Sequence, residues 1–392
     1  MKKFFRTHPE LIYLNSGSHS LVPLSVIQEV KAELDLYEQN PTAGMFQAWQ
    51  KLWSVQKQIA PHFGANPKNF FFRANVTQPL NEFILGVKLP PASEILTSDQ
   101  EYGAVFNICR FRAERDSLNL KTFTMPSRQE ISEMTADDLV DRVVSSFTPK
   151  TKMLVISEIF TGSGVVVPLE KIGREARARG IFTVIDGAHS PGFLKLDLEN
   201  SSLDFYAGNL HKWWMGPKGT GFGWARRESF TELQPIQAGW ISYDLQEPFA
   251  SFAEGDPQAI RSLMLGCHDF SPFFALLATL KFWQEQGQNQ IFSLKRALDN
   301  HLISEAERIL GFPRFASKDS QMQGPLHSFL MPEKFSKIVF TKLIEDLLEQ
   351  TKVQCSINFV NGEMYLRLSP HIYNNKDEIT EALLRLKKFF TL

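Results

Sequence analysis

The most constraining feature of this chain is an alternation of short apolar runs with an amphipathic helical pattern near its middle. The runs KMLVIS (152–157) and IFTVID (181–186) are almost continuously apolar, which is typical of strands buried on both faces of a sheet. Between them, PLEKIGREARARG (168–180) has a proline where a helix starts and a glycine where it stops. Strand, helix and strand in this order predict a βαβ unit and a mostly parallel sheet.

Further runs extend this pattern toward the C-terminus. SLDFYAG (202–208) and TGFGWA (220–225) predict two more strands, and in such sheets ligands bind beyond the carboxyl ends of the strands. A long helical pattern follows at about 261–286, which Pro272 either breaks or begins. The tail mixes amphipathic helices with short strands such as MYLRLS (364–369). We therefore predict an α/β fold, with a large domain built on a mostly parallel sheet and a smaller α+β domain.

The predicted division of the chain has three parts. An N-terminal segment (1–25) joins the small domain or the mouth of the active site. A large α/β domain (26–265) follows. A linking helix and a small C-terminal α+β domain (266–392) complete the chain, whose 392 residues are enough for both domains.

Composition excludes several classes of protein. The formal net charge of −1 gives no indication of a nucleic-acid partner or an anionic membrane. No apolar stretch is long enough to span a bilayer, and the first residues lack the apolar run of a signal peptide. Cys109, Cys267 and Cys355 lie far apart, which excludes a disulfide framework and favours a reducing compartment. We expect a soluble, cytoplasmic protein.

A lysine stands among aromatic residues in YAGNLHKWWMGPKGTGFG (206–223), which ends in a glycine-rich loop. A lysine chosen at random is a solvated surface residue. Trp213 and Trp214, however, predict partial burial of Lys212, and desolvation lowers the pKa of a lysine amine and makes it nucleophilic. Such lysines form Schiff bases with carbonyl substrates and with pyridoxal phosphate, so Lys212 is the candidate catalytic amine.

An acid and a histidine follow the second apolar run in VIDGAHSPG (184–192). Asp186 ends a buried strand, and a pyridoxal-phosphate enzyme needs an anion against the ring nitrogen of its cofactor. His189 follows in a turn within reach of the phenolic oxygen of such a ring. Taken singly, Asp186 is better explained as a turn residue and His189 as a structural histidine. Their occurrence together with Lys212 in a βα context favours the functional interpretation.

The candidate phosphate site lies in FFFRANVTQPLNEFILG (70–86), which predicts a strand, a polar turn and an amphipathic helix. Asn75, Val76 and Thr77 fall at the turn into the helix. Free N–H groups and the positive end of the helix dipole favour a phosphate there, and Thr77 adds a hydroxyl. Taken alone, the pattern fits an ordinary helix N-cap better.

These motifs together resemble the class V aminotransferase family of fold-type I pyridoxal-phosphate enzymes, and its isopenicillin N epimerase-like members in particular. The resemblance rests on YAGNLHKWWMGPKG, VIDGAHSPG and LIYLNSGSHSLVP (11–23). The tail LRLSPHIYNNKDEI (366–379) is similar to the Arg-x-Ser…Tyr-Asn…Asp ending of the same group. The match extends from about residue 11 to 379, and its most specific part is the pairing of Asn-x-His-Lys-Trp with Asp-x-Ala-His.

The resemblance implies a role for each matching residue around a bound pyridoxal 5'-phosphate. Lys212 would hold the cofactor through a Schiff base and move the α-proton of the substrate, and Asp186 would pair with the pyridine nitrogen. His189 and Thr161 would lie near the ring oxygen, while Tyr102 would stack on the ring face. The phosphate would be held by residues from two motifs: Asn75, Val76, Thr77, Asn209 and His211.

The resemblance also implies a small-molecule substrate, an amino acid, and a homodimer. Arg367 and Asn15 would bind the substrate, with Arg367 clamping its α-carboxylate, a task suited to a planar bidentate donor. One departure concerns the cofactor contact made across the dimer. The family often has Gly-Thr-Arg-Asp here, whose Thr reaches the neighbouring subunit's phosphate, whereas this chain has Cys267 and His268. A thiol is a poor donor, so either backbone N–H groups carry this contact or the cross-subunit contribution is weak.

Several alternatives remain open from the sequence. Cysteine desulfurases and selenocysteine lyases share the family, but need a nucleophilic cysteine on a flexible loop, whereas Cys355 falls in a predicted strand. A catalytically inactive binding module would be expected to have lost site residues. The four main ones are all present: Lys212, Asp186, His189 and Arg367. A metal hydrolase is poorly supported, because the sequence contains no HExxH motif. The strip YEQNPTAGMFQAW (37–49) either lines the substrate mouth or is a surface helix end. We expect transamination or epimerisation of an amino acid or a related amine.

Overall fold

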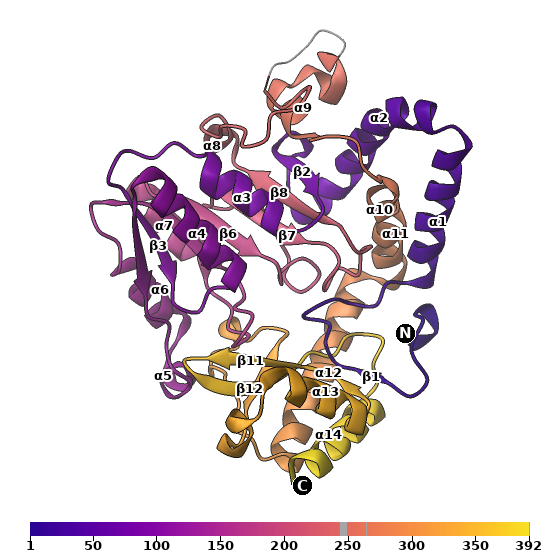
Figure 1. Cartoon of the computed structure of the whole chain (residues 1–392), viewed down its shortest axis with the longest axis vertical. Helices are drawn as coiled ribbons and strands as arrows, with labels where there is room; N and C mark the ends of the chain where they lie inside the picture. The colour runs from indigo at the N-terminus through magenta and orange to yellow at the C-terminus, as the bar shows by residue number, and fades with distance from the viewer. Residues whose placement is uncertain (244–248, 264, 392) are drawn as a thin grey trace.

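A seven-stranded sheet lies at the centre of the larger part of the computed structural model, which describes residues 1–243, 249–263 and 265–391 (Figure 1). Its strands are β2 (Phe70–Arg73), β3 (Glu94–Ser98), β4 (Asn119–Phe123), β5 (Thr151–Ser157), β6 (Phe182–Gly187), β7 (Phe205–Asn209) and β8 (Gly221–Ala225). The spatial order is β2-β8-β7-β6-β5-β3-β4. Strands β3 to β7 run parallel, and β8 and β2 pair antiparallel at one edge. The predicted mostly parallel sheet is thereby confirmed.

Side chains alternate between the two faces of this sheet, and helices cover both. Phe70 and Phe72 of β2 belong to one apolar core and Phe71 to another, as the two-residue period of a strand requires. The core of Phe71 is closed by α3 (Thr77–Gly86) and α4 (Gly103–Asp116). The opposite core is closed by α2 (Pro41–Ile59), α6 (Ala136–Val144) and α7 (Leu169–Ala178). Both faces are therefore buried, which explains the continuously apolar runs in the sequence.

The C-terminal part of the chain forms a smaller unit below this sheet, drawn in orange to yellow (Figure 1). An antiparallel sheet of β11 (Ser356–Val360), β12 (Glu363–Leu368) and β9 (His327–Leu330) packs with α12 (Gln288–Ile309), α13 (Phe340–Thr351) and α14 (Lys376–Thr391) around a separate core. The N-terminal strand β1 (Ile12–Tyr13) pairs in parallel with β10 (Val353–Gln354) in this unit. The exact domain limits, 26–265 and 266–392, stay a prediction.

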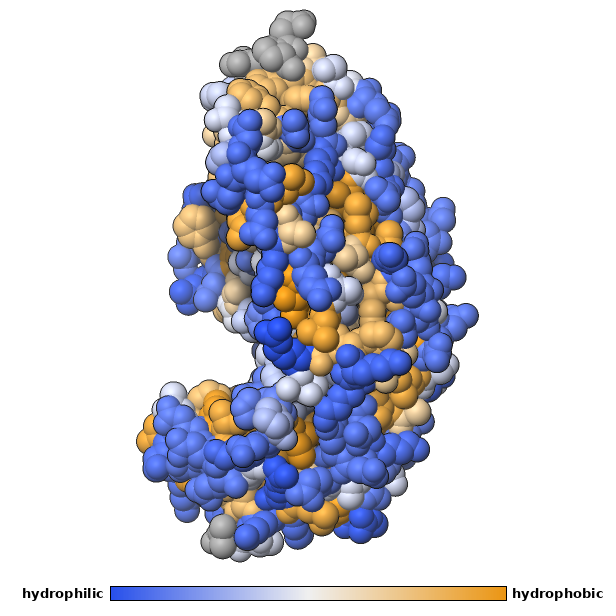
Figure 2. All heavy atoms as spheres, turned by 90° about the vertical axis from the view of Figure 1, so that its right-hand side faces the viewer, coloured by the Kyte–Doolittle hydropathy of each residue, from blue (hydrophilic) through white to orange (hydrophobic). Residues whose placement is uncertain are grey.

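The remaining helices surround the two units: α1 (Leu24–Gln39), α5 (Arg128–Glu133), α8 (Arg227–Phe230), α9 (Pro257–Leu263), α10 (Ser271–Phe274) and α11 (Leu276–Gln286). Pro272 stands in the first turn of α10, so it begins a helix. None of the helices in the described ranges is long and apolar enough to cross a membrane. Figure 2 shows that one side of the molecule is hollowed between its upper and lower parts.

Candidate active site

A cavity of about 320 Å³ lies at the carboxyl ends of the parallel strands, where the two units meet. Most of the residues predicted from the sequence line it: Asn75, Val76, Thr77, Tyr102, Thr161, Asp186, Asn209, His211, Lys212 and Arg367. His189 reaches the same cluster through hydrogen bonds to Thr161 and Lys212, and Asn15 through one to Arg367. Segments that are more than 300 residues apart in the chain thus converge on one site.

Lys212 lies in the loop between β7 and β8, and tight backbone contacts fix that loop. Its carbonyl accepts from the N–H of Met215 at 2.9 Å, and Trp213 and Trp214 beside it are buried, as predicted. The backbone of Gly192 approaches the peptide between the two tryptophans so closely that a Cβ would lie 2.4 Å from it. At a φ of +88°, only glycine fits this approach comfortably, so the VIDGAHSPG turn and the lysine loop pack as one unit.

The electrostatic surroundings of Lys212 favour a nucleophilic amine. Burial lowers the pKa of Lys212 to about 8, with Asp186 opposing the change and Arg367 adding to it. The uncharged amine is therefore much more populated near neutral pH than in an ordinary lysine, although the ammonium form still predominates. This agrees with the desolvation predicted from the flanking tryptophans.

Asp186 stands at the carboxyl end of β6, opposite Ser157 of β5 and Ala207 of β7. Its Oδ1 accepts the backbone N–H of Ala188 at 2.8 Å, and within the described residues no donor bonds to Oδ2. Burial raises the pKa of Asp186, while the Ala188 N–H and Lys212 oppose this rise. A cation at Oδ2 would therefore stabilise the carboxylate.

His189 is held between three side chains. The indole N–H of Trp213 donates to Nδ1 of His189 at 3.3 Å, and Nε2 lies 2.8 Å from Oγ1 of Thr161 and 3.3 Å from Nζ of Lys212. Burial lowers the pKa of His189 well below its ordinary value, with Lys212 and Arg367 adding to the effect. The ring is therefore neutral, and because Nδ1 accepts a hydrogen bond, the proton resides on Nε2.

The start of α3 differs from the sequence prediction in one respect. The N–H of Val76 donates to Oδ1 of Asn209 at 2.9 Å, and the N–H of Thr77 donates to Oδ1 of Asn75 at 3.0 Å. These two N–H groups were expected to be free for a phosphate, and that expectation was wrong for this structure. The side-chain oxygen of Asn75, in the turn itself, and that of Asn209, at the end of β7, cap these first-turn donors.

A pair of stacked histidines nevertheless lies at the same end of the cavity. The rings of His19 and His211 stack with centroids 4.8 Å apart, and both line the cavity. Burial lowers the pKa of His211 to about 3, with His19 and Lys212 contributing, and burial lowers the pKa of Lys218 to about 8. The ring of His211 is therefore neutral near neutral pH, and an anion bound at this end of the cavity would favour its protonated form.

Arg367 comes from β12 of the smaller unit and is almost fully buried. Its terminal nitrogens donate to the carbonyl of Thr161 at 3.1 Å, Oδ1 of Asn15 at 3.2 Å and Oγ of Ser18 at 3.1 Å. Its Nε is buried without a hydrogen-bond partner in the described part of the chain. A guanidinium fixed in this way at the cavity wall is suited to bind a carboxylate.

Two of the predicted residues lie at the edge of this arrangement or outside it. Tyr102 lines the cavity at the start of α4 and is 54% exposed, so one face of its ring is open. Cys267 is exposed and lines a different, apolar cavity with Phe46, Trp49 and Trp240. The strip at 37–49 contributes to this second cavity. Because the contact predicted for Cys267 is with a neighbouring subunit, it stays a prediction.

Sequence reasoning missed several residues of the site. Gly17 and Ser18 of the N-terminal segment line the cavity, as do Ser356 and Asn358 of β11. Glu101, which precedes Tyr102, bonds to Ser157, the residue paired with Asp186. The run SGSH after Asn15 was a usable signal for the N-terminal residues, whereas the others have no local signature. No group of three or more His, Cys, Asp or Glu residues in the described ranges is arranged to hold a metal.

The family profile described as "Aminotransferase class-V" matches residues 12–382. The chain belongs to the class V aminotransferase family. It is 29% identical to the isopenicillin N epimerase of Streptomyces clavuligerus over 95% of this chain and 93% of the relative. It is 23% identical to a probable cysteine desulfurase of Pyrococcus abyssi, over 95% of this chain and 93% of that protein.

Solved structures with the same fold include one of the cystine C–S lyase C-DES with its reaction product cysteine persulfide. The TM-score is 0.84 at 21% identity, covering 97% of this chain and 98% of that chain. The apo cysteine desulfurase of Thermococcus onnurineus gives a TM-score of 0.81 at 19% identity, covering 100% of this chain and 97% of that one. These likenesses confirm the predicted fold.

Pyridoxal phosphate is the cofactor of this family, and the residues of the cavity fit it. Asp186 keeps one carboxylate oxygen available for a pyridinium nitrogen, and Lys212 presents an amine of lowered pKa. The hydroxyl of Thr77 and the rings of His19 and His211, whose protonation a bound anion would favour, suit a phosphate beside α3. His189 presents Nε2–H toward Lys212, where a phenolic oxygen would accept it.

Proposed function

We propose that this chain is a pyridoxal-phosphate-dependent enzyme acting at the α-carbon of an amino acid or a related amine, by transamination or epimerisation. The observation that carries the proposal is the convergence of Lys212, Asp186, His189 and Arg367 on one cavity. Family membership and the isopenicillin N epimerase relatives support it. A homodimer and a cytoplasmic location belong to the same proposal.

The roles of the residues follow from their positions. The bound cofactor supplies a ring that accepts electrons from the α-carbon of the substrate. The amine of Lys212 would hold the cofactor, and its Nζ, when free, would accept the α-proton of the substrate. The Asp186 carboxylate keeps the ring nitrogen protonated. Arg367 fixes the substrate carboxylate, so the Cα–H bond is held toward Lys212.

Desulfuration through a cysteine nucleophile is the alternative, because several relatives are named probable cysteine desulfurases. It needs a thiolate that reaches the substrate. Cys355 lies between β10 and β11, is 7% exposed, and burial raises the pKa of its thiol to about 12. A buried thiol of this kind is a poor nucleophile, which favours chemistry without a protein cysteine. The intact set of site residues likewise argues against an inactive binding module.

The first experiment is an absorption spectrum of the purified protein, before and after borohydride reduction, followed by peptide mapping. We expect a yellow protein whose reduced label is on Lys212. Lys212→Ala should carry no label, whereas Lys281→Ala, at an exposed lysine, should label as the unmodified protein does. A colourless protein that takes up no added pyridoxal phosphate contradicts the proposal. Exchange of the α-hydrogen in heavy water, with or without a keto-acid product, then separates transamination from epimerisation.

A further inference from the structure

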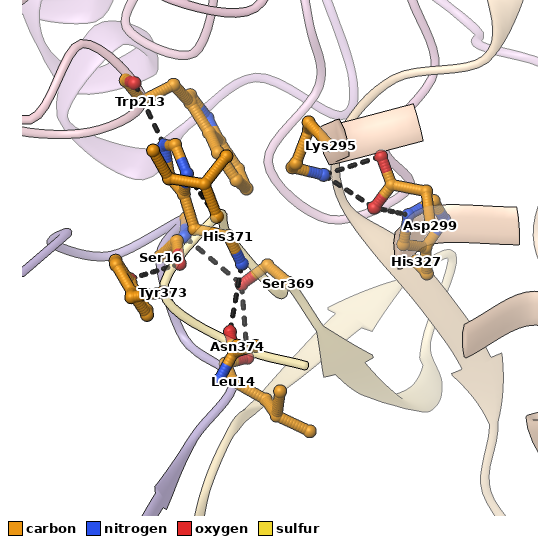
Figure 3. A network of polar contacts seen from close by, with 12 residues as sticks. Leu14, Ser16, Trp213, Lys295, Asp299, His327, Ser369, His371, Tyr373 and Asn374 are labelled. Carbon is orange, nitrogen blue, oxygen red and sulfur yellow. Dashed lines mark hydrogen bonds and ion pairs between the residues drawn. The ribbon is translucent and has the colours of Figure 1, made fainter. Parts of the chain in front are cut away.

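A buried ion pair lies next to Trp213, the residue that follows Lys212 (Figure 3). Its members, Lys295 and Asp299, are one turn apart on α12, and both side chains are buried. Nζ of Lys295 lies 2.5 Å from Oδ1 and 2.6 Å from Oδ2 of Asp299, so one ammonium donates to both carboxylate oxygens. His327 of β9 donates from Nε2 to the same carboxylate, 2.9 Å from Oδ1. Neither member of the pair lines the active-site cavity, so substrate contact does not account for it.

The pair is charged near neutral pH. Burial alone would raise the pKa of Asp299, but Lys295 and His327 bring it below its ordinary value. Burial lowers the pKa of Lys295, and Asp299 opposes this change. Burial also lowers the pKa of His327, which is therefore neutral, and Arg314 interacts with both His327 and the carboxylate. The charge of Lys295 thus depends on Asp299, because burial without the carboxylate favours the uncharged amine.

One aromatic ring connects this ammonium to His189. Nζ of Lys295 lies over the indole of Trp213, 4.9 Å from its centroid. The N–H of the same indole donates to Nδ1 of His189 at 3.3 Å. A cation over an indole face is attracted by the π electrons of the ring. Its field draws electron density away from the N–H, which makes that group a stronger donor to His189.

The bond from the indole determines where the proton of His189 resides. Because Nδ1 accepts from Trp213, the proton is on Nε2, which lies 2.8 Å from Oγ1 of Thr161 and 3.3 Å from Nζ of Lys212. In the other tautomer, an N–H at Nδ1 would face the N–H of the indole without an acceptor. A charge pair on α12 of the smaller unit therefore influences the donor that faces Lys212.

We propose that Lys295 is a positioning residue whose ammonium polarises the indole of Trp213 and thereby keeps the proton of His189 on Nε2. Asp299 keeps that ammonium charged. The inference rests on the proposed function, because Nε2 of His189 is the donor assigned to the phenolic oxygen of the cofactor. The ionisation of the bound cofactor then depends on a charge pair that lies outside the cavity.

The test removes both charges at once with the double variant Lys295→Met/Asp299→Asn, which leaves neither charge buried without its partner. In the full chain as purified, the nitrogen NMR shifts of the His189 ring report which nitrogen carries the proton, and His189→Gln assigns these signals. We expect the ratio of the Nδ1–H to the Nε2–H form to rise roughly twofold in the double variant. In the holoenzyme, the midpoint of the cofactor's pH-dependent absorption should move by about 0.3 pH units, in the same direction as in Trp213→Phe.

Further variants separate this coupling from a structural role. Asp299→Asn alone should give the same shifts, because the buried amine loses its charge, and it replaces the double variant if the latter does not fold. In a Trp213→Phe background, removal of the pair should cause no further shift. Lys51→Met is the matched control, because the ammonium of Lys51 also lies over a ring, 4.5 Å from the centroid of Phe274, and is paired with Glu33. It should leave both readouts unchanged.

The outcomes that overturn the inference are distinct from a failure of the proposed function. A double variant that only lowers the melting temperature, with unchanged histidine shifts and an unchanged absorption midpoint, assigns the pair a structural role alone. An equal midpoint shift in the Trp213→Phe background also overturns the inference, because the effect then does not pass through the indole. If the protein takes up no pyridoxal phosphate, the proposed function fails, while the histidine shifts still decide whether the pair controls the tautomer.

Discussion

Trp213 donates its indole N–H to Nδ1 of His189, and this bond determines which nitrogen of the histidine carries the proton. The ring of Trp213 lies under the ammonium of Lys295, 4.9 Å from its centroid. Its carbonyl accepts from Nε2 of His371 at 2.9 Å. Figure 3 shows this carbonyl contact and the ion pair of Lys295 with Asp299, the latter also bonded to His327. Trp213, the residue next to Lys212, is thus held from both units of the chain.

The first prediction concerns this indole. Trp213→Phe keeps an aromatic ring and removes the one donor to Nδ1 found among the described residues, so the proton of His189 can move to Nδ1 and Nε2 loses its N–H. We expect turnover to fall by roughly fivefold, the effect of one hydrogen bond. The midpoint of the cofactor's pH-dependent absorption should shift as well.

The matched control is Trp53→Phe, because the indole nitrogen of Trp53 is also buried but has no hydrogen-bond partner in the described residues. It loses similar ring area and should leave the absorption midpoint in place. An unchanged midpoint in Trp213→Phe would show that the tryptophan only fills space.

The second prediction concerns Asp186. Asp186→Asn removes the charge that pairs with the ring nitrogen while keeping the shape and the bond to Ala188. We expect turnover to fall by roughly 10²-fold or more, because this electrostatic support acts on charge that develops during the reaction. Cofactor content should change much less, since the phosphate and Lys212 contacts remain. Normal turnover in this variant would sink the assignment of Asp186.

The third prediction concerns the buried thiol. Cys355→Ser changes one atom in a site that is closed to solvent, and we expect it to leave turnover and product distribution unchanged. Sulfide or persulfide release from free cysteine is the product to monitor. If the unmodified protein releases sulfur and Cys355→Ser does not, the enzyme is a desulfurase with a cysteine nucleophile.

The sequence predicted the strands of the sheet because burial on both faces leaves a continuous apolar run, as in β5 and β6. It also predicted Lys212 and Asp186, because each motif is local and the family pairing is specific. Asn358 and Glu101 were not predicted, because their place at the cavity depends on how distant segments pack. The cap made by Asn75 is the N-cap alternative that the sequence offered, whereas the one made by Asn209 was not predicted, because Asn209 reaches Val76 across 133 residues of sequence.

Glu101 provides the last prediction, because it is a second buried acid near Asp186. Its carboxylate accepts from the N–H of Ser157 at 3.1 Å, the hydroxyl of Ser157 at 2.5 Å and the hydroxyl of Ser98 at 3.0 Å. Burial raises the pKa of Glu101 from 4.5 to about 7, against these hydrogen bonds and with a further contribution from Asp186. The folded chain therefore holds a proton that the unfolded chain releases between pH 4.5 and about 7.

The sign of the effect on stability follows from this difference. Where the folded state binds more protons, the free energy of unfolding falls as pH rises, so Glu101 destabilises the fold increasingly from pH 4.5 to about 7. Glu101→Gln does not titrate and retains acceptors and a donor for the two serines. The melting temperature of the variant, relative to the unmodified protein, should rise across this window and level off above it. Glu114→Gln, at an exposed glutamate of α4, should show no such trend, and a constant offset for Glu101→Gln would mean that Glu101 is already ionised at low pH.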